Sequence, residues 1–146
     1  MQVLYLCDPL DRGGIQRKIE YPNVTALVFD ENERWLSKAQ RFFSMQPHSL
    51  LAAEGYACAI ALALAALLPV EELMLRKCAL FKRSAYKYAP AQLRRIAGFA
   101  RRNLPLAAAH IRLFDTEEAE IARLQNAVSR FAQLEACEPW PFLQQE

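Results

Sequence analysis

The chain has 146 residues, of which 53% are hydrophobic and 23% charged, and its formal net charge is +2. This length and composition predict one globular domain over residues 1–146 and exclude a disordered or low-complexity chain. No basic, apolar leader opens the sequence, and the four cysteines form no CxxC pair. We therefore expect a cytoplasmic protein with reduced thiols, no metal site and no cofactor.

The first part of the chain alternates between apolar runs and one amphipathic segment. Gln2 to Cys7 and Val24 to Asp30 are short and apolar, as buried strands are. After Asn32, which is suited to cap a helix, apolar residues recur at helical spacing between 35 and 43. This part therefore predicts two strands and a helix that ends before Pro47.

The central stretch has the clearest pattern in the chain. Ser49 to Ala53 predicts a strand buried on both faces, and Glu54-Gly55-Tyr56 breaks it. Ala57 to Leu68 contains only apolar residues, mostly Ala and Leu, which favour a helix. Pro69 ends that helix, and Val70 to Leu75 predicts the next strand. Strand, turn, helix and strand together make one βαβ unit.

The same stretch raises the question of a membrane span. Leu50 to Val70 contains a single charged residue, Glu54. Gly55 and Pro69 leave an apolar run of only 13 residues between them, whereas a spanning helix needs about 20. We expect no membrane span.

The last part of the chain predicts two helices, a strand and a tail. Pro90 precedes a helix over 91–103, and Ala107 to Phe114 predicts a strand. Asp115 or Thr116 is expected to cap a final helix. Its apolar face comprises Ile121, Leu124, Val128, Phe131 and Leu134. The tail carries Trp140 and Phe142, which either fold back onto the domain or dock on a second chain.

The central stretch resembles the nucleophile elbow of the α/β-hydrolase family. That family places Gly-x-Ser-x-Gly between a buried strand and a small-residue helix. Here Gly55 occupies the serine position, and Ala53 and Ala57 take the flanking glycine positions. Without a hydroxyl or thiol at position 55, the covalent acyl-enzyme route is closed.

The resemblance implies further departures from the family pattern. The family's acid follows the strand matched to Ala107–Phe114, where this chain has Asp115, but no histidine follows His110. Cys7-Asp8 stands where the family has a His-Gly pair, and an acid there would repel a developing oxyanion. The expected fold is a three-layer α/β/α sandwich with about five mostly parallel strands, either hydrolase-like or flavodoxin-like.

In such sheets, ligands bind at the carboxyl ends of the strands, near the point where strand order reverses. This predicts a small-molecule crevice with the free amides of the following helix at its floor. Its candidate residues are Cys7, Asp8, Asp30, Glu54, Gly55, Tyr56 and Asp115.

Charge is distributed unevenly along the chain. Residues 74–114 contain ten Lys or Arg and no Asp or Glu, and the remainder contains eight basic and all sixteen acidic residues. This segment can bind nucleic acid, an anionic membrane or an acidic partner, or it can pair with acidic residues of its own chain or of a second copy. No recognition-helix or RNA-binding motif favours nucleic acid. The candidate basic surface comprises Arg76, Lys77, Lys82, Arg83, Lys87, Arg94, Arg95, Arg101 and Arg102.

Three functional hypotheses follow. The first is a non-catalytic, hydrolase-like protein that works through ligand binding or assembly, with a homodimer or another protein as partner. The second is an enzyme with an atypical thiol or carboxylate mechanism, for which Cys7, Cys58 or Ser49 would have to replace the missing serine. The third is an anion or nucleic-acid binder that uses the basic segment.

Overall fold

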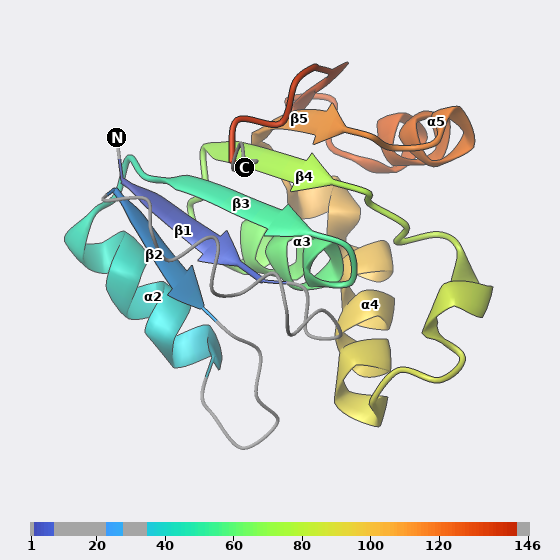
Figure 1. Cartoon of the computed structure of the whole chain (residues 1–146), viewed down its shortest axis with the longest axis horizontal. Helices are drawn as coiled ribbons and strands as arrows, with labels where there is room; N and C mark the ends of the chain where they lie inside the picture. The colour runs from blue at the N-terminus through green and yellow to red at the C-terminus, as the bar shows by residue number, and fades with distance from the viewer. Residues whose placement is uncertain (1, 8–22, 28–34, 143–146) are drawn as a thin grey trace, which may run out of the picture.

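The computed structural model describes residues 2–7, 23–27 and 35–142. One six-stranded sheet organises the chain, in the order β2-β1-β3-β4-β5-β6, and every neighbouring pair is parallel (Figure 1). Its strands are β1 (Val3–Leu6), β2 (Val24–Leu27), β3 (Leu50–Glu54), β4 (Glu72–Arg76), β5 (His110–Phe114) and β6 (Gln133–Ala136). The predicted α/β class with a parallel sheet is confirmed, with six strands in place of five.

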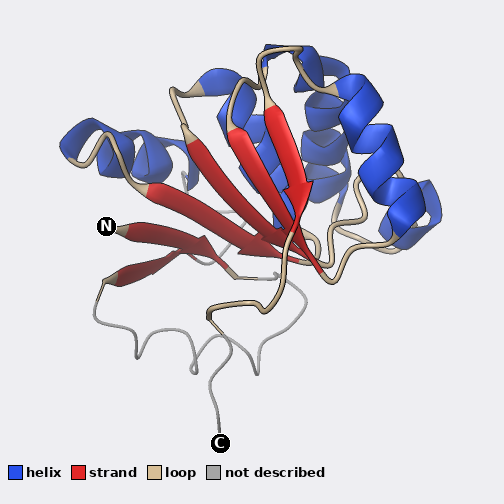
Figure 2. Cartoon of the chain, turned by 90° about the horizontal axis from the view of Figure 1, so that it is seen from above, coloured by secondary structure: helices blue, strands red, loops and turns tan. Residues whose placement is uncertain are grey.

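The described helices lie on one side of this sheet (Figure 2). They are α2 (Trp35–Met45), α3 (Ala57–Leu67), α4 (Ala91–Asn103) and α5 (Glu118–Ala127), with short 3-10 turns η1 (Arg83–Tyr86) and η2 (Leu104–Leu106). From β2 onward the chain crosses the sheet in one direction only. Crossovers of a single hand then place every connecting helix on the same face.

Helix α3 forms the centre of the helical layer. Nine of its eleven residues are buried, because it packs against the sheet on one side and α4 on the other. Burial all round explains why its sequence has no polar stripe. Among the helices that the structure describes, none combines the length and apolar character needed to cross a bilayer.

The opposite face of the sheet has its own small core. Tyr5, Met74 and Phe114 point to this side and pack with Trp140 and Phe142 from the tail. Trp140 is only 4% exposed, so the tail folds back onto its own domain, which was the first of the two predicted arrangements. Within the described ranges, the tail covers this face where the predicted sandwich would have a further helical layer.

The end of the chain differs from the prediction. Helix α5 ends at Ala127 instead of continuing to Leu134, and Gln133–Ala136 becomes edge strand β6. Phe131 continues the helical spacing in the sequence but is 71% exposed. Pairing with the edge of β5 satisfies the backbone hydrogen-bonding groups of this segment. The periodicity of the side chains does not reveal this stabilisation.

The predicted helix caps also need correction. Glu117 is the N-cap of α5, and its side chain makes no capping hydrogen bond. The Thr116 hydroxyl instead accepts a hydrogen bond from the Cys78 amide, and Asp115 pairs with Arg76. Asp115 therefore binds the last residue of β4 and Thr116 binds the segment that follows β4, rather than the helix next to them. The predicted cap Asn32 lies outside the described residues.

Glu120 of α5 anchors that same segment. Its carboxylate is buried and accepts a hydrogen bond from the Phe81 amide, with an N–O distance of 2.7 Å. Burial raises the pKa of Glu120 above its ordinary value, and the backbone amides of Phe81 and Leu80 only partly oppose the shift. The native state therefore binds this proton more tightly than the unfolded chain does.

A raised native pKa fixes the sign of the pH dependence. The contribution of Glu120 to stability should rise as pH falls from neutral towards 4.5, the ordinary value, because the native state takes up its proton first. Glu120→Gln should abolish this dependence, and Glu120→Ala should lower the free energy of unfolding by about 1–3 kcal/mol by removing the acceptor. Urea denaturation across this pH range measures both effects. Glu118→Gln, on the exposed side of α5, is the control and should change neither quantity.

Candidate functional site

Three neighbouring strands end in the same unusual way at the carboxyl edge of the sheet. Gly55, Lys77 and Asp115 directly follow β3, β4 and β5, and they have φ angles of 57°, 53° and 47°. The preceding residues Glu54, Arg76 and Phe114 are in register. Glycine adopts this left-handed backbone freely and aspartate tolerates it, but lysine rarely does. Such conformations gather at functional sites, where the surrounding structure holds them in place.

A single arginine connects the three strand ends. The Nη1 atom of Arg76 lies 3.2 Å from a Glu54 carboxylate oxygen, and its Nε atom lies 3.0 Å from an Asp115 oxygen. Burial alone would lower the pKa of Arg76, but hydrogen bonds to Asp115 and Glu54 outweigh that effect and raise it. This guanidinium therefore stays charged and holds both acids in place.

Glu54 also affects the opposite face of the sheet. The Glu54 side chain is 10% exposed, and its charge reaches Tyr5 on β1. Burial first, and then the Glu54 carboxylate, raises the pKa of Tyr5 far above its ordinary value. Tyr5 therefore remains a neutral phenol beside the ion pair.

A cavity of about 390 Å³ opens beside Gly55. Its wall comes from the turn after β3 and from the segment between β4 and α4, and two lysine residues line it. The Tyr56 hydroxyl donates a hydrogen bond to the Ala85 carbonyl, and the Tyr56 and Tyr86 rings meet edge to face at 5.2 Å. These contacts fix the wall to the turn. The lining residues are Gly55, Tyr56, Lys77, Ala79, Lys82, Ser84, Ala85 and Tyr86.

The backbone amides around this turn are partly used. Gly55 donates to the Arg76 carbonyl at 3.0 Å, and Cys58 and Ala59 donate to the carbonyls of Gly55 and Tyr56. The prediction of a floor of free helix amides is therefore wrong for Cys58 and Ala59. Neither the Tyr56 nor the Ala57 amide donates a backbone hydrogen bond to another described residue.

The predicted crevice residues separate into three groups. Gly55 and Tyr56 line the cavity, whereas Glu54 and Asp115 lie at the same sheet edge, bound to Arg76. Cys7 is buried on the opposite face with Tyr5 and Phe142. Asp8 and Asp30 lie outside the described residues. The cavity residues at 77–86 were not assigned to the crevice, although their position after β4, next to Gly55, could have indicated them.

The residues of the predicted basic surface lie at several different places in the structure. Arg76 pairs with Glu54 and Asp115, and Lys82 pairs with the Glu117 side chain at 3.7 Å. Arg101 donates a hydrogen bond to the Leu80 carbonyl. Lys77 and Lys82 border the cavity. Exposed residues Arg83 and Lys87 lie on or beside η1, whereas Arg94, Arg95 and Arg102 gather on α4.

Both histidines of the chain lie far from the cavity along the strands. His48 precedes β3 and contacts Glu71, and His110 begins β5 and contacts Glu72 and Glu135. Because the strands are parallel, these positions are at the amino edge of the sheet. The cavity at the carboxyl edge therefore has no imidazole beside it.

The cysteines are all described, and no disulfide joins them. Cys58 is fully buried, and its sulfur lies 3.5 Å from the Arg76 carbonyl oxygen and 3.7 Å from that of Ala53. Cys137 is the most exposed, but burial and the Glu135 charge raise its pKa. A raised pKa disfavours the thiolate, the form that acts as a nucleophile.

Comparisons with known proteins identify the fold. No family model matches the chain, and no curated protein sequence matches it. Solved structures do match. One of them, reported for LipS and LipT, two metagenome-derived lipolytic enzymes, superposes with a TM-score of 0.62 at 12% sequence identity. The match covers 94% of this chain and 83% of that one. The chain therefore has an α/β-hydrolase-like fold.

Proposed function

We propose that this protein binds a small anionic molecule in the cavity beside Gly55 and does not turn it over. The observation that carries the proposal is the cavity itself. Its volume of about 390 Å³ falls within the range of small-molecule sites, roughly 300–1,000 Å³. It also lies at the carboxyl edge of a parallel sheet, where such folds bind their ligands.

The charge around the cavity supports an anionic ligand. Lys77 and Lys82 line it, Lys82 also pairs with Glu117 at 3.7 Å, and no acidic residue is among the described residues that line the cavity. The Asp115 carboxylate at the same edge is paired with Arg76, so its charge is compensated. Ala79, Ala85 and the Tyr86 ring provide apolar surface beside the ammonium groups. A carboxylate with a short aliphatic chain matches both features.

Three observations support binding without turnover. Gly55, at the position that the resemblance matches to the nucleophile, has no side chain. Both histidines lie at the other edge of the sheet, so neither can activate a group at the cavity. Cys7 and Cys58 are buried, which disfavours the alternative thiol mechanism.

An NMR titration tests the binding site. Aliphatic carboxylates from acetate to octanoate, added to the uniformly ¹⁵N-labelled protein, should shift the amide signals of Gly55, Tyr56 and Lys77. The matching alcohols should shift them much less, because they lack the charge. Native mass spectrometry of the freshly purified protein should show whether a ligand is retained.

Two variants make the test specific. Ser84→Trp should fill the cavity from its exposed rim, and Lys77→Gly should remove an ammonium group while favouring the left-handed backbone. Both should weaken carboxylate binding, Lys77→Gly by about threefold, because Lys77 is exposed and water screens its charge. Lys87→Ala removes an exposed charge outside the cavity and should have no effect. Equal shifts with carboxylates and alcohols, or shifts unchanged by Ser84→Trp, would contradict the proposal.

A further inference from the structure

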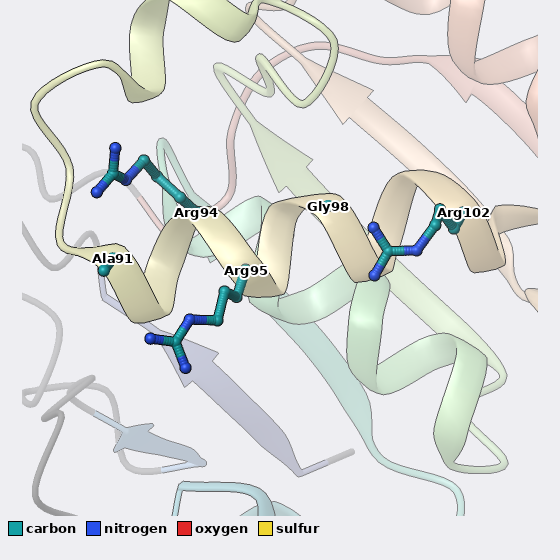
Figure 3. Close-up of a pocket in the computed structure, with 5 residues that line it drawn as sticks. All are labelled: Ala91, Arg94, Arg95, Gly98 and Arg102. Carbon is teal, nitrogen blue, oxygen red and sulfur yellow. The ribbon is translucent and has the colours of Figure 1, made fainter.

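A second concave surface lies on α4, away from Gly55. A cavity of about 500 Å³ is lined by Ala91, Arg94, Arg95, Gly98 and Arg102. These residues follow one another at helical spacing along a single face of α4. Figure 3 shows Arg94 and Arg95 extending to either side near the start of the helix, with Arg102 nearer its end.

Gly98 creates the hollow between these arginines. A Cβ atom added there would lie 3.2 Å from Nη1 of Arg102, so this guanidinium reaches back over the glycine (Figure 3). Glycine inside a helix costs about 1 kcal/mol relative to alanine. The room that Gly98 leaves for the Arg102 guanidinium therefore comes at a cost in helix stability.

The charge of this cluster is not compensated within the described chain. Arg94, Arg95 and Arg102 are all exposed, and no carboxylate of the described residues lies within ion-pair distance of them. By contrast, Arg76 and Arg112 each pair with acids of their own chain. The surplus positive charge of the 74–114 segment is therefore concentrated, in part, at this one place.

An apolar groove runs beside the cluster and shares two of its residues. It has a volume of about 350 Å³, lies between α2, α3 and α4, and is bordered by Arg95 and Arg102. Leu67 at its edge is 50% exposed. The apolar side chains that line it are Leu36, Ala63, Leu67, Ile96 and Phe99.

We propose that this face of the molecule docks an acidic amphipathic helix from a partner protein. Because Arg95 and Arg102 border both the groove and the charged cavity, one ligand must present apolar and negative groups side by side. The lining spans positions 91–102, about 16 Å along the helix axis, which is roughly three turns of a docked helix. Apolar anchors in a groove flanked by complementary charge are how amphipathic helices are recognised.

The shape of the surface favours a helix over other anionic ligands. A single acyl chain could occupy the groove but would not place negative groups beside all three arginines. Nucleic acid would need a longer basic track with exposed aromatic rings for stacking. The cluster instead offers three guanidinium groups beside an apolar groove. Lipid and nucleic acid are therefore outcomes that the experiment must separate.

The test uses a fluorescein-labelled synthetic peptide of about 18 residues, or five helical turns. Leucines occupy positions i, i+3, i+4 and i+7, with glutamates flanking the leucine stripe. A second peptide carries lysine at every glutamate position. The full-length protein should bind the acidic peptide in fluorescence anisotropy, with an affinity that falls as salt is added, and should not bind the basic peptide.

Variants of both halves of the surface define the site. Arg94→Ala/Arg95→Ala/Arg102→Ala should weaken binding about tenfold. Leu67→Asp should weaken it by a similar factor, because the apolar face of the peptide would meet a charge. Arg83→Ala/Lys87→Ala/Arg130→Ala removes the same number of exposed charges elsewhere and should leave the affinity unchanged.

Three results would overturn the proposal. The first is equal loss of binding in the two triple variants, which would indicate attraction by net charge alone. The second is loss with the α4 variant but not with Leu67→Asp, which would indicate a purely ionic ligand. The third is tighter, arginine-dependent binding to phosphatidylglycerol vesicles or to single-stranded oligothymidine than to the acidic peptide. Ser84→Trp should leave peptide binding intact, so the proposal for this surface and the proposal for the Gly55 cavity are tested independently.

Discussion

Replacing Arg76 with Met is expected to lower the free energy of unfolding by about 3 kcal/mol, the typical cost of breaking a buried ion pair. The methionine keeps the apolar part of the side chain but removes the cation that Glu54 and Asp115 share. The Glu54 side chain is only 10% exposed, so water cannot replace the guanidinium. Urea denaturation followed by circular dichroism at neutral pH measures the loss.

The effect should depend on pH and on the partner residue. Without Arg76 the native pKa of Glu54 rises, so the variant should regain stability as pH falls and the carboxylate is protonated. Glu54→Gln in the same background should recover part of the loss at neutral pH. Arg112→Met is the matched control, because Arg112 pairs with Glu72 in a more exposed position, with both side chains 31% exposed. An equal loss of unfolding free energy in both arginine variants would show that burial of the Arg76–Glu54 pair does not add to its stabilising effect.

Trp140→Ala should lower the free energy of unfolding by about 3–5 kcal/mol, as expected for removing a large aromatic side chain from a core. The indole meets Tyr5, Phe114 and Phe142 edge to face, with ring centroids 6.2, 5.0 and 5.2 Å away. These rings make up much of the small core on the face opposite the described helices. The tail is thus a structural part of the domain rather than an appendage.

Thermal and urea denaturation of this variant should show one cooperative transition at reduced stability. Phe131→Ala is the control, since it removes an aromatic ring that is 71% exposed and should change stability by less than about 0.5 kcal/mol. A Trp140→Ala protein as stable as the wild type would mean that the tail does not cover the sheet in solution.

The central βαβ unit could be predicted from the sequence because its local signals agree. An apolar run, a glycine and an uninterrupted Ala-Leu segment gave β3, the turn and α3 to within a residue or two. Gly55 has the positive φ that a sharp strand-to-helix turn requires. Strand β6 could not be predicted in this way, because Gln133–Ala136 is half polar and gains its structure from pairing with β5.

The candidate site was predicted only in part, for a related reason. The sheet edge and Gly55 follow from strand order, but the cavity wall depends on contacts between distant residues. Lys77 adopts a left-handed backbone that nothing in its own sequence signals. Arg76 looked like part of a basic surface, yet it is bound to two acids from neighbouring strands. Such pairings become visible only once the register of the strands is known.

The most direct test of binding without turnover is the initial rate of p-nitrophenyl butyrate hydrolysis by the purified wild-type protein. This short ester reports the acyl transfer that the fold resemblance implies, and its hydrolysis needs no cofactor. We predict a rate equal to that of buffer alone, because that cavity has neither a nucleophile at position 55 nor an imidazole beside it. Saturable hydrolysis above background that is lost in Ser84→Trp would contradict this account and show that the cavity is a working active site.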